Sequence, residues 1–452
     1  MSFPRYPHYK ESGVEWLGEV PEGWEVLPLK KTCHVFPSNV DKKSYDDEVN
    51  INLCNYTDVY YNEIIVAGMD FMAATATADQ IAKFTLRAGD TIITKDSESA
   101  DDIAIAAYVP EDMPGIVCGY HLSMIRPTPG FCGAFIKRLF DSRYAKARFQ
   151  VLANGLTRMG LGQYALDNIK FAFPPANEQQ TIAAFLDRET AKIDALVAEQ
   201  ENLIALLKEK RQAVISHAVT KGLDPTVPMK DSGIEWLGEM PAHWEVKRLK
   251  QVSPQITVGI VIEPSKYYVD EGIPALRSLN VGKKGEILED NLVFISEEGH
   301  DLNSKSKLST GDLVAVRSGQ PGTTSVVSEK FDGCNCIDLI IIRKPNIGSE
   351  FFLYWFLGSD AALIQFVMGS GGAIQQHFNV GAAVNLVVPW PNESDQNEIV
   401  AFLDTETAKV DTLTAEAQRA IDLLKERRSA LISAAVTGKI DVRGYDAELP
   451  HH

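Results

Sequence analysis

One stretch of 42 residues occurs twice, and it constrains this chain more than any other feature. Gln179 to Thr220 returns 217 positions later as Gln396 to Thr437, and about 26 of the 42 positions are identical. Neither copy contains Gly or Pro, and good helix formers fill both, so each copy predicts one long helix. At 1.5 Å per residue, such a helix is roughly 60 Å long, more than one small core can enclose. We therefore expect the two helices to pack against each other.

Apolar residues recur in both copies at alternating spacings of three and four. This pattern is typical of a coiled-coil seam, although Glu189, Gln200 and Lys210 interrupt it in the first copy. The predicted seam residues are Leu186, Ile193, Leu196, Leu203, Leu207 and Val214 in the first copy, and Leu403, Val410, Leu413, Leu424 and Leu431 in the second.

A second repeat opens each half of the chain. Residues 12–30 read SGVEWLGEVPEGWEVLPLK, and residues 232–250 read SGIEWLGEMPAHWEVKRLK. The chain is therefore predicted to be two tandem units, roughly 1–223 and 224–440, joined at the proline-containing segment Asp224 to Lys230. Because four tryptophans keep their places in both copies, we expect them to serve packing. They are Trp16, Trp24, Trp236 and Trp244.

Each long helix is preceded by a segment that reads as mixed α/β. β-Rich runs alternate with turns rich in Gly, Asn and Asp, and prolines end the last run before each helix. The expected strands are 90–94, 103–109, 169–173, 312–316, 337–342 and 384–388, and the expected helices are 131–152 and 350–368. The predicted domains are 1–176 and 224–393, with spacer helices 177–223 and 394–440 and a polar tail, 441–452.

Composition sets limits on partners and location. The net charge of −17 argues against nucleic acid as a ligand, unless local basic loops or a basic partner supply the attraction. Six cysteines in 452 residues fit a reducing cytosol, and Cys334 and Cys336 lack zinc-ligand spacing, so no metal site is expected. No apolar run approaches the roughly 18 residues of a membrane helix, and the first residues show no signal segment. We expect a cytoplasmic protein without a membrane partner.

No catalytic motif is present. The chain has no phosphate loop of the GxxxxGK[ST] type, no glycine-rich dinucleotide turn, and no HExxH, CxxC or GxSxG. Glu245 and Lys247 have a spacing seen in metal-dependent nucleases, but an alternating strand explains them better because no acidic partner is evident. The chain is therefore not expected to be an enzyme or to bind a cofactor by itself.

Polar loops instead recur at matching places in the two halves. Arg, Gln and Asn can each make paired hydrogen bonds to base edges, and Ser and Lys can reach phosphates, so these loops are candidate DNA contacts, with solvated surface turns as the alternative. The candidates in the first half are Asn55, Tyr56, Lys95, Ser97, Thr157, Arg158, Gln163 and Tyr164. Those in the second half are Arg277, Ser278, Asn280, Arg317, Ser318, Gln320, Gln375, Gln376 and His377.

Taken together, these motifs resemble the specificity subunits of type I restriction-modification systems. The resemblance covers nearly the whole chain, and it rests on the order of variable domain, helix, variable domain and helix. It also rests on four stretches of sequence: ESGVEWLGEVPEGWEV with its repeat, NYTDVYYN at Asn55 to Asn62, PPxxEQxxIxxFLDxET at Pro174 to Thr190, and the closing LLKEKRQAVISHAVTKGL. The second helix departs from the usual start, with Asn392 to Gln396 reading NESDQ.

The resemblance implies an α/β (α+β) protein with a pseudo-two-fold tandem repeat. Two target-recognition domains would each read one half of a bipartite, asymmetric DNA site, and two long antiparallel coiled-coil helices would separate them. The helices would set the spacing and dock two methyltransferase subunits, which carry S-adenosylmethionine chemistry. A separate restriction and translocase subunit would use ATP and Mg²⁺. The chain itself would bind double-stranded DNA without catalysing a reaction.

Several alternatives stay open at this point. The same kind of subunit serves fusions of methyltransferase and nuclease that cut on both sides of their site, and an orphan DNA-binding adaptor of a modification methylase is also compatible. A single-chain methylase or nuclease would need catalytic motifs, and a pure coiled-coil scaffold would not need two divergent variable domains.

Overall fold

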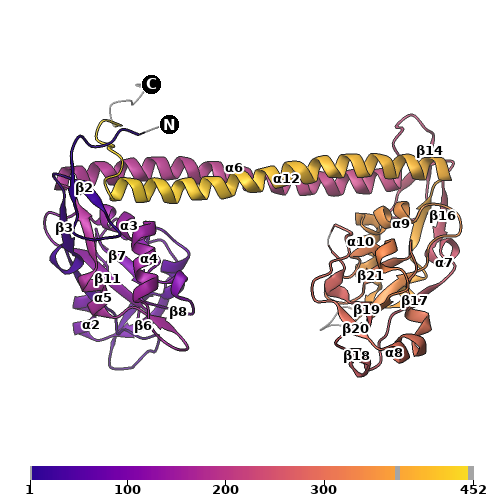
Figure 1. Cartoon of the computed structure of the whole chain (residues 1–452), viewed down its shortest axis with the longest axis horizontal. Coiled ribbons are helices and arrows are strands. Elements are labelled where there is room, and N and C mark those ends of the chain that lie inside the picture. Colours follow the sequence, from indigo (N-terminus) through magenta and orange to yellow (C-terminus); the bar gives the residue numbers. More distant parts are fainter. Residues whose placement is uncertain (1–2, 283, 372–376, 446–452) are drawn as a thin grey trace. The chain divides into compact units, whose positions relative to one another are not determined.

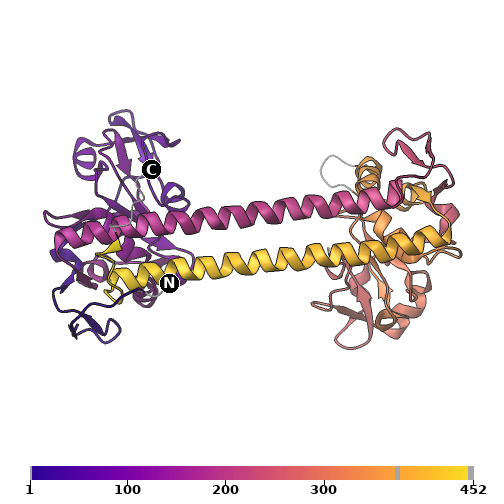
Figure 2. The same cartoon turned by 90° about the horizontal axis from the view of Figure 1, so that it is seen from above.

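The computed structural model describes residues 3–282, 284–371 and 377–445, and it divides the chain into two compact units. Unit 1 comprises Met1–Glu201 and Arg419–His452, and unit 2 comprises Asn202–Gln418. Each unit therefore contains a globular domain and one part of each of two long helices, α6 (Ala176–Lys221) and α12 (Glu393–Val436). Within each unit these helices lie side by side (Figure 1 and Figure 2).

The globular domain of unit 1 contains short strands and short helices. Its helices are α1 (Tyr56–Tyr60), α2 (Ala78–Phe84), α3 (Gly133–Asp141), α4 (Arg143–Leu152) and α5 (Gln163–Asn168). Its strands are β1 (Tyr9–Glu11), β2 (Glu19–Pro21), β3 (Glu25–Pro28), β4 (Cys33–Pro37), β5 (Val49–Cys54), β6 (Met72–Ala76), β7 (Thr91–Thr94), β8 (Asp96–Ser97), β9 (Ala106–Tyr108), β10 (Ile116–Cys118), β11 (Leu122–Pro127), β12 (Met159–Gly160) and β13 (Lys170–Phe173).

The globular domain of unit 2 is also built from short strands and short helices, in a similar but not identical order. Its helices are α7 (Leu249–Val252), α8 (Glu297–Leu302), α9 (Glu350–Leu357), α10 (Asp360–Gly369) and α11 (Val380–Ala383). Its strands are β14 (Met229–Asp231), β15 (Glu239–Pro241), β16 (Glu245–Arg248), β17 (Ile256–Val258), β18 (Tyr268–Val269), β19 (Ile273–Leu276), β20 (Val293–Ile295), β21 (Leu313–Val316), β22 (Thr324–Val326), β23 (Asn335–Cys336), β24 (Leu339–Ile342), β25 (Ser370–Gly371), β26 (His377–Phe378) and β27 (Val387–Trp390).

Corresponding sheets organise the two domains. In unit 1 an antiparallel sheet has the strand order β4–β11–β7–β9, and in unit 2 its counterpart has the order β17–β24–β21–β22. A second sheet contains a parallel pair in both domains, β5 with β10 and β19 with β23. The central strands β7 and β21 are buried at every position, because helices and the second sheet cover both of their faces. Helices α3 and α9 pack their apolar sides into the main core of each unit.

The starts of the two long helices are built alike. Prolines precede both, and a glutamine one turn into each helix bridges to the globular domain. The Gln179 side chain accepts from the Cys132 N–H at 2.8 Å and donates to the Pro174 carbonyl at 2.9 Å. Gln396 makes the same two bonds, with the N–H of Ser349 at 2.7 Å and the carbonyl of Pro391 at 2.9 Å. The internal repeat therefore fixes the helix to its own domain in the same way twice.

The helices end at glycines in the left-handed conformation, as helix C-termini commonly do. Gly222 follows α6 with φ +76°, and Gly438 follows α12 with φ +71°. Beside the first residues of these helices lie the inner tryptophans of the repeat. Trp24 and Trp244 are buried, and their indole N–H groups donate to Glu178 and Asp395 at 3.1 and 2.8 Å. Of the outer tryptophans, Trp236 is partly buried and packs against the core of unit 2, and Trp16 is half exposed with its ring against Tyr144 and Arg148.

The seam between the long helices corrects part of the predicted seam. Leu196, Leu203 and Leu413 are 44%, 42% and 49% exposed, so they do not form the seam. Their neighbours Val197, Ile204 and Thr414 face inward instead. The inward-facing residues, spaced four and three apart, are Ile193, Val197 and Gln200 of α6 with Ile421, Leu424 and Arg428 of α12 in unit 1, and Ile204, Leu207 and Arg211 of α6 with Val410, Thr414 and Ala417 of α12 in unit 2.

Three of the eleven predicted seam residues lie one position away from the seam, because polar residues such as Arg211 and Arg428 occupy seam positions and interrupt its apolar pattern. Arg428 donates to Asp194 at 2.8 Å in unit 1, and Arg211 pairs with Asp411 at 3.3 Å in unit 2. These two ion pairs occupy equivalent positions of the 217-residue repeat. In unit 1 Arg428 pairs with Asp194, and Lys425 lies 3.9 Å from Glu201. Residue numbers on α12 therefore decrease where those on α6 increase, so the two helices are antiparallel. The predicted residues Leu186, Ile193, Leu207, Leu403, Val410 and Leu431 are buried, and Val214 and Leu424 are partly buried.

The predicted fold class is confirmed: a mixed helix and strand protein with two long paired helices. Five of the expected strands are present but shorter, whereas the strand expected at 384–388 lies at Val387–Trp390 and continues through Pro389, which was expected to end it. Ser142 and the Gly358–Ser359 turn divide each expected helical patch into two helices. The domain limits drawn from the sequence stay a prediction.

Among the described residues, no single helix is long and apolar enough to cross a membrane. The bent pair α9 and α10 passes that test on length and composition alone.

Candidate nucleic-acid interface

A buried ion pair fixes the central strand of each domain. Asp90, just before β7, accepts from Arg126 of β11 at 2.6 Å, and Asp312 accepts from Arg343 at 2.6 Å. Both aspartates are almost fully buried, and the guanidinium groups match their charge, so the strand cannot shift without leaving an unpaired buried carboxylate. Residues at the far ends of β7 and β21 are therefore held in defined positions.

A loop docks on that strand end in the same way in both domains. In unit 1 residues 154–160 form a loop closed by two hydrogen bonds between the backbones of Asn154 and Gly160, and the Leu161 N–H then donates to the Lys95 carbonyl at 2.9 Å. In unit 2 strands β25 and β26 close the matching loop, and the Phe378 N–H donates to the Arg317 carbonyl at 2.9 Å. Lys95 and Arg317 thus hold equivalent places, because each accepts a backbone hydrogen bond from the residue that follows the loop, Leu161 or Phe378.

The predicted residue Lys95 lies in a charged network in unit 1. Lys95 Nζ is 3.0 Å from the Asp96 carboxylate and 4.8 Å from the centre of the Tyr120 ring. His121 Nδ1 lies 3.0 Å from the same carboxylate. Burial raises the pKa of Asp96, but hydrogen bonds from His121 and Lys95 outweigh it and lower the pKa overall. Sequence reasoning missed Tyr120 and His121, whose signal was their position directly before strand β11.

Tyr56, Ser97 and Arg158 come together although they are far apart in the sequence. Burial raises the pKa of Tyr56, while a hydrogen bond with Ser97 and the charge of Arg158 act in the opposite direction. Ser97 itself is buried, since β8 pairs with β12 at Ser97 and Met159. Asn55 lies at the N-terminus of α1, where its N–H donates to Asp58 at 2.7 Å. The structure therefore brings these candidates into one cluster, with Ser97 covered.

The remaining candidates of unit 1 lie at its surface. Thr157 and Arg158 are exposed in the 154–160 loop. Tyr164, in α5, is 83% exposed, and the neighbouring Gln163 is also exposed. Tyr164 follows the arginine-containing loop by a few residues in the chain, and together they offer apolar contact and hydrogen-bond donors, as base-reading surfaces require.

In unit 2 the structure places Asn280 differently from the prediction. It is fully buried, and its amide donates to the carbonyls of Leu288 and Asp290 at 3.0 and 3.1 Å. Asn280 therefore ties its own turn together and has no exposed polar atom for a base. Arg277 is held by a bond from Nη2 to the Asn291 carbonyl at 2.6 Å, and Ser278 is partly buried.

Arg317 is the best-placed candidate of unit 2. Its Nη1 donates to Asp338 at 3.0 Å, and Asp338 has φ +54°, a backbone conformation that is uncommon outside glycine. Asp338 corresponds in the repeat to His121, so both domains place a titratable residue beside the basic one. Ser318 is partly buried and Gln320 is exposed. Gln375 and Gln376 lie outside the described residues, and for His377 the structure describes only the backbone of β26.

Nothing in the described ranges gathers three or more His, Cys, Asp or Glu side chains as a metal site would. The cysteines are free thiols, and all except Cys132 are buried. Burial raises the pKa of Cys33 to about 12, which keeps it protonated and poorly reactive. The arrangement is that of a binding surface made from loops on a rigid frame.

Comparison with known proteins agrees with this arrangement. Residues 21–205 match the family model described as type I restriction modification DNA specificity domain. The type I restriction enzyme EcoKI specificity subunit of Escherichia coli is 23% identical over 452 residues, covering 96% of this chain and 92% of that protein. The MjaVIII specificity subunit of Methanocaldococcus jannaschii is 23% identical over 291 residues, covering 61% and 63% of the two chains.

Solved structures share the fold. A structure concerning complex assembly and conformational transition of the type I R-M system aligns with a TM-score of 0.71 at 17% identity, covering 92% of this chain and 98% of that one. The HsdS subunit from Thermoanaerobacter tengcongensis aligns with a TM-score of 0.53 at 17% identity, covering 93% and 98%. Residues 21–205 thus match the type I restriction modification DNA specificity domain, and over nearly its whole length the chain is similar to specificity subunits of type I restriction enzymes.

Proposed function

We propose that this chain reads DNA sequence for a type I restriction-modification complex, with each globular domain recognising one half of a bipartite, asymmetric site. The observation that carries the proposal is the loop docked at Lys95 and again at Arg317 by the same backbone bond. Two related domains that recognise different half-sites require the same supporting strands but different loop residues. Base contacts then come from loop side chains, and the frame supplies orientation.

The long helices would set the distance between half-sites and dock two methyltransferase subunits. Those partners would bind S-adenosylmethionine and carry out methylation, and restriction subunits would use ATP and Mg²⁺ in the cytoplasm. The chain would be the non-catalytic reader. Its net charge of −17 fits a subunit that depends on its partners for much of the electrostatic attraction to DNA.

The test is methylation mapping of the chain together with its methyltransferase partner. Replacing residues 31–173 by the matching segment of a related specificity subunit should change one half of the methylated site and leave the other half and the spacer as they were. A change in both halves would contradict the assignment of one domain to each half.

A point variant sharpens the same test. Arg158→Ala should weaken recognition of the first half-site by roughly 1–3 kcal/mol, the usual loss for one good base contact. The matched control is Arg87→Ala, because Arg87 is an exposed arginine of the same domain that lies before β7, at the end opposite Lys95. Equal effects from the two variants would mean that general charge, and not the loop, determines recognition.

A further inference from the structure

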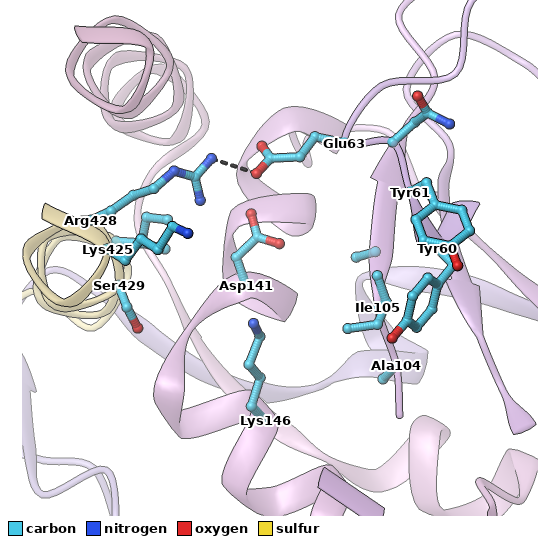
Figure 3. Close-up of a pocket in the computed structure, with 13 residues that line it drawn as sticks. Tyr60, Tyr61, Glu63, Ala104, Ile105, Asp141, Lys146, Lys425, Arg428 and Ser429 are labelled. Atoms are coloured by element: carbon cyan, nitrogen blue, oxygen red, sulfur yellow. Dashed lines mark hydrogen bonds and ion pairs between the residues drawn. The ribbon is translucent and has the colours of Figure 1, made fainter. Parts of the chain in front are cut away.

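A polar pocket of about 360 Å³ lies in unit 1 between the globular domain and α12 (Figure 3). Lys146 of α4 and Lys425 of α12 enter it from two sides (Figure 3). Tyr61 and Asn62, just after α1, also line it. Arg428 and Ser429 complete the wall on α12. The pocket therefore combines two flexible cations with neutral hydrogen-bond donors.

The carboxylates of this pocket are already matched by other cations. Glu63 is paired with Lys137 at 3.0 Å and also with Arg428, and Asp141 is paired with Lys137 at 2.7 Å. Arg138 adds contacts to both carboxylates at 3.4 Å. Within the described residues Lys146 makes no ion pair, and Lys425 has only an exposed, long contact with Glu201 at 3.9 Å. The two lysines are therefore free to meet an anion from outside.

The pocket is continuous with the predicted reading surface. Its lining residue Tyr60 stacks on Tyr56 at 5.4 Å and donates to Asp102 at 2.8 Å. Tyr56 in turn reaches Ser97 and the charge of Arg158. An anion held between Lys146 and Lys425 would thus lie next to the loops proposed to read the first half-site.

Unit 2 has the same pocket with different chemistry. Its volume is about 280 Å³, and Arg211 and Ile215 line it at the positions that Arg428 and Ile432 hold in unit 1. Leu363 stands where unit 1 has Lys146. The repeat therefore supplies the pocket, and the pair of free lysines belongs to unit 1.

We propose that the pocket of unit 1 anchors the DNA backbone beside the first half-site, with Lys146 and Lys425 each contacting a phosphate. The inference rests on the proposed DNA-reading function. Lysine suits this role because its ammonium is a compact charge on a flexible stem that binds phosphate without demanding paired geometry. Such contacts position a protein on DNA without reading sequence.

The test compares the salt dependence of specific DNA binding by the complex of this chain with its methyltransferase partner. Each phosphate contact contributes about 0.9 to the slope of log affinity against log salt. The variant Lys146→Gln with Lys425→Gln should therefore lower the slope by about 1.8. The methylated sequence should stay the same.

The matched control is Lys192→Gln with Lys409→Gln, which removes two charges from the long helices. Both lysines are exposed and pair with a glutamate three residues earlier. An equal change of slope in both double variants, or no change in the pocket variant, would overturn the proposal. Loss of co-purification with the methyltransferase would also overturn it, by showing that a protein partner occupies the pocket. Failure of the unmodified complex to methylate a specific site would instead refute the proposed function itself.

Discussion

Glu63 forms ion pairs with three cations of unit 1, Lys137, Arg138 and Arg428. Burial alone raises its pKa, but Lys137, Arg428 and Arg138 outweigh burial and lower the pKa from 4.5 to about 2. A carboxyl whose pKa is depressed on folding stabilises the native state above its unfolded pKa, and this stabilisation disappears as the pH falls towards the folded pKa. Its contribution should therefore be complete above pH 4.5 and should be lost between pH 4.5 and about 2.

Glu63→Gln should consequently be less stable than the unmodified chain at pH 6, and the difference should shrink as the pH falls through that window. Chemical unfolding of both proteins, followed at several pH values from 6 downwards, measures it. Glu426→Gln is the control, because the ion pair that Glu426 makes among the described residues is an exposed contact of 3.7 Å with Arg143. A difference that does not depend on pH would contradict the role given to Glu63.

At this scale the sequence indicates which residue types recur, but not which of them are covered. Lys95 and Arg317 could be predicted because each follows a buried strand at an equivalent place. Asn280 is also a polar residue in a turn, but its side-chain amide donates to the backbone carbonyls of residues eight and ten positions further on. Tyr120 was missed because its approach to Lys95 depends on pairing between strands that are distant in the sequence.

At the scale of single elements, the repeat correctly predicts that the two long helices pack against each other. It is less reliable in predicting which residues of each helix face the other. On α6, Leu196 and Leu203 each come one residue before a seam residue, Val197 and Ile204, and it is the leucines that are exposed. The true seam contains Gln200 and Arg211, whose polar character hides the heptad pattern. The ion pairs of Arg211 with Asp411 and Arg428 with Asp194 make those polar positions compatible with partial burial.

Neighbouring residues provide the test of this register. Ile204→Ala should lower stability by roughly 1–2 kcal/mol, since a partly buried isoleucine loses apolar contact with α12. Leu203→Ala should cost less, because Leu203 is 42% exposed and therefore loses less buried apolar contact. Chemical unfolding midpoints of the two variants provide the measurement. Equal losses would mean that both stripes contact the partner helix.

For the whole molecule, the division into units shows how one duplication builds two similar bodies. Unit 1 takes its last helical segment, Arg419 onward, from the far end of the chain. The order of domains and helices could be predicted because the repeat is long and its copies agree. The details of each reading loop could not, since they differ between halves and depend on contacts with the frame.

The duplication makes a specific prediction for a half-length chain, residues 1–223. In unit 1 the core includes Leu431, Ile432, Ala435 and Val436 of α12. The fragment lacks these residues, but α6 of a second copy carries Val214, Ile215, Ala218 and Val219 at the equivalent positions. Three of the four are identical, and the ion pair of Arg428 with Asp194 can re-form from Arg211 of the second copy. The fragment should therefore dimerise with its α6 helices antiparallel about a two-fold axis.

A two-fold dimer presents the same reading loops twice in opposite senses, so its site should be an inverted repeat of the first half-site. The spacer should stay close to that of the intact chain, because helices of the same length set it. Sedimentation equilibrium gives the stoichiometry, and methylation mapping with the partner subunit gives the site. Ile215→Asp in the fragment is the control and should abolish both dimer and activity, because it buries a charge without a partner. A folded monomer, or an active dimer that reads an asymmetric site, would show that the two halves are not equivalent in the way the repeat implies.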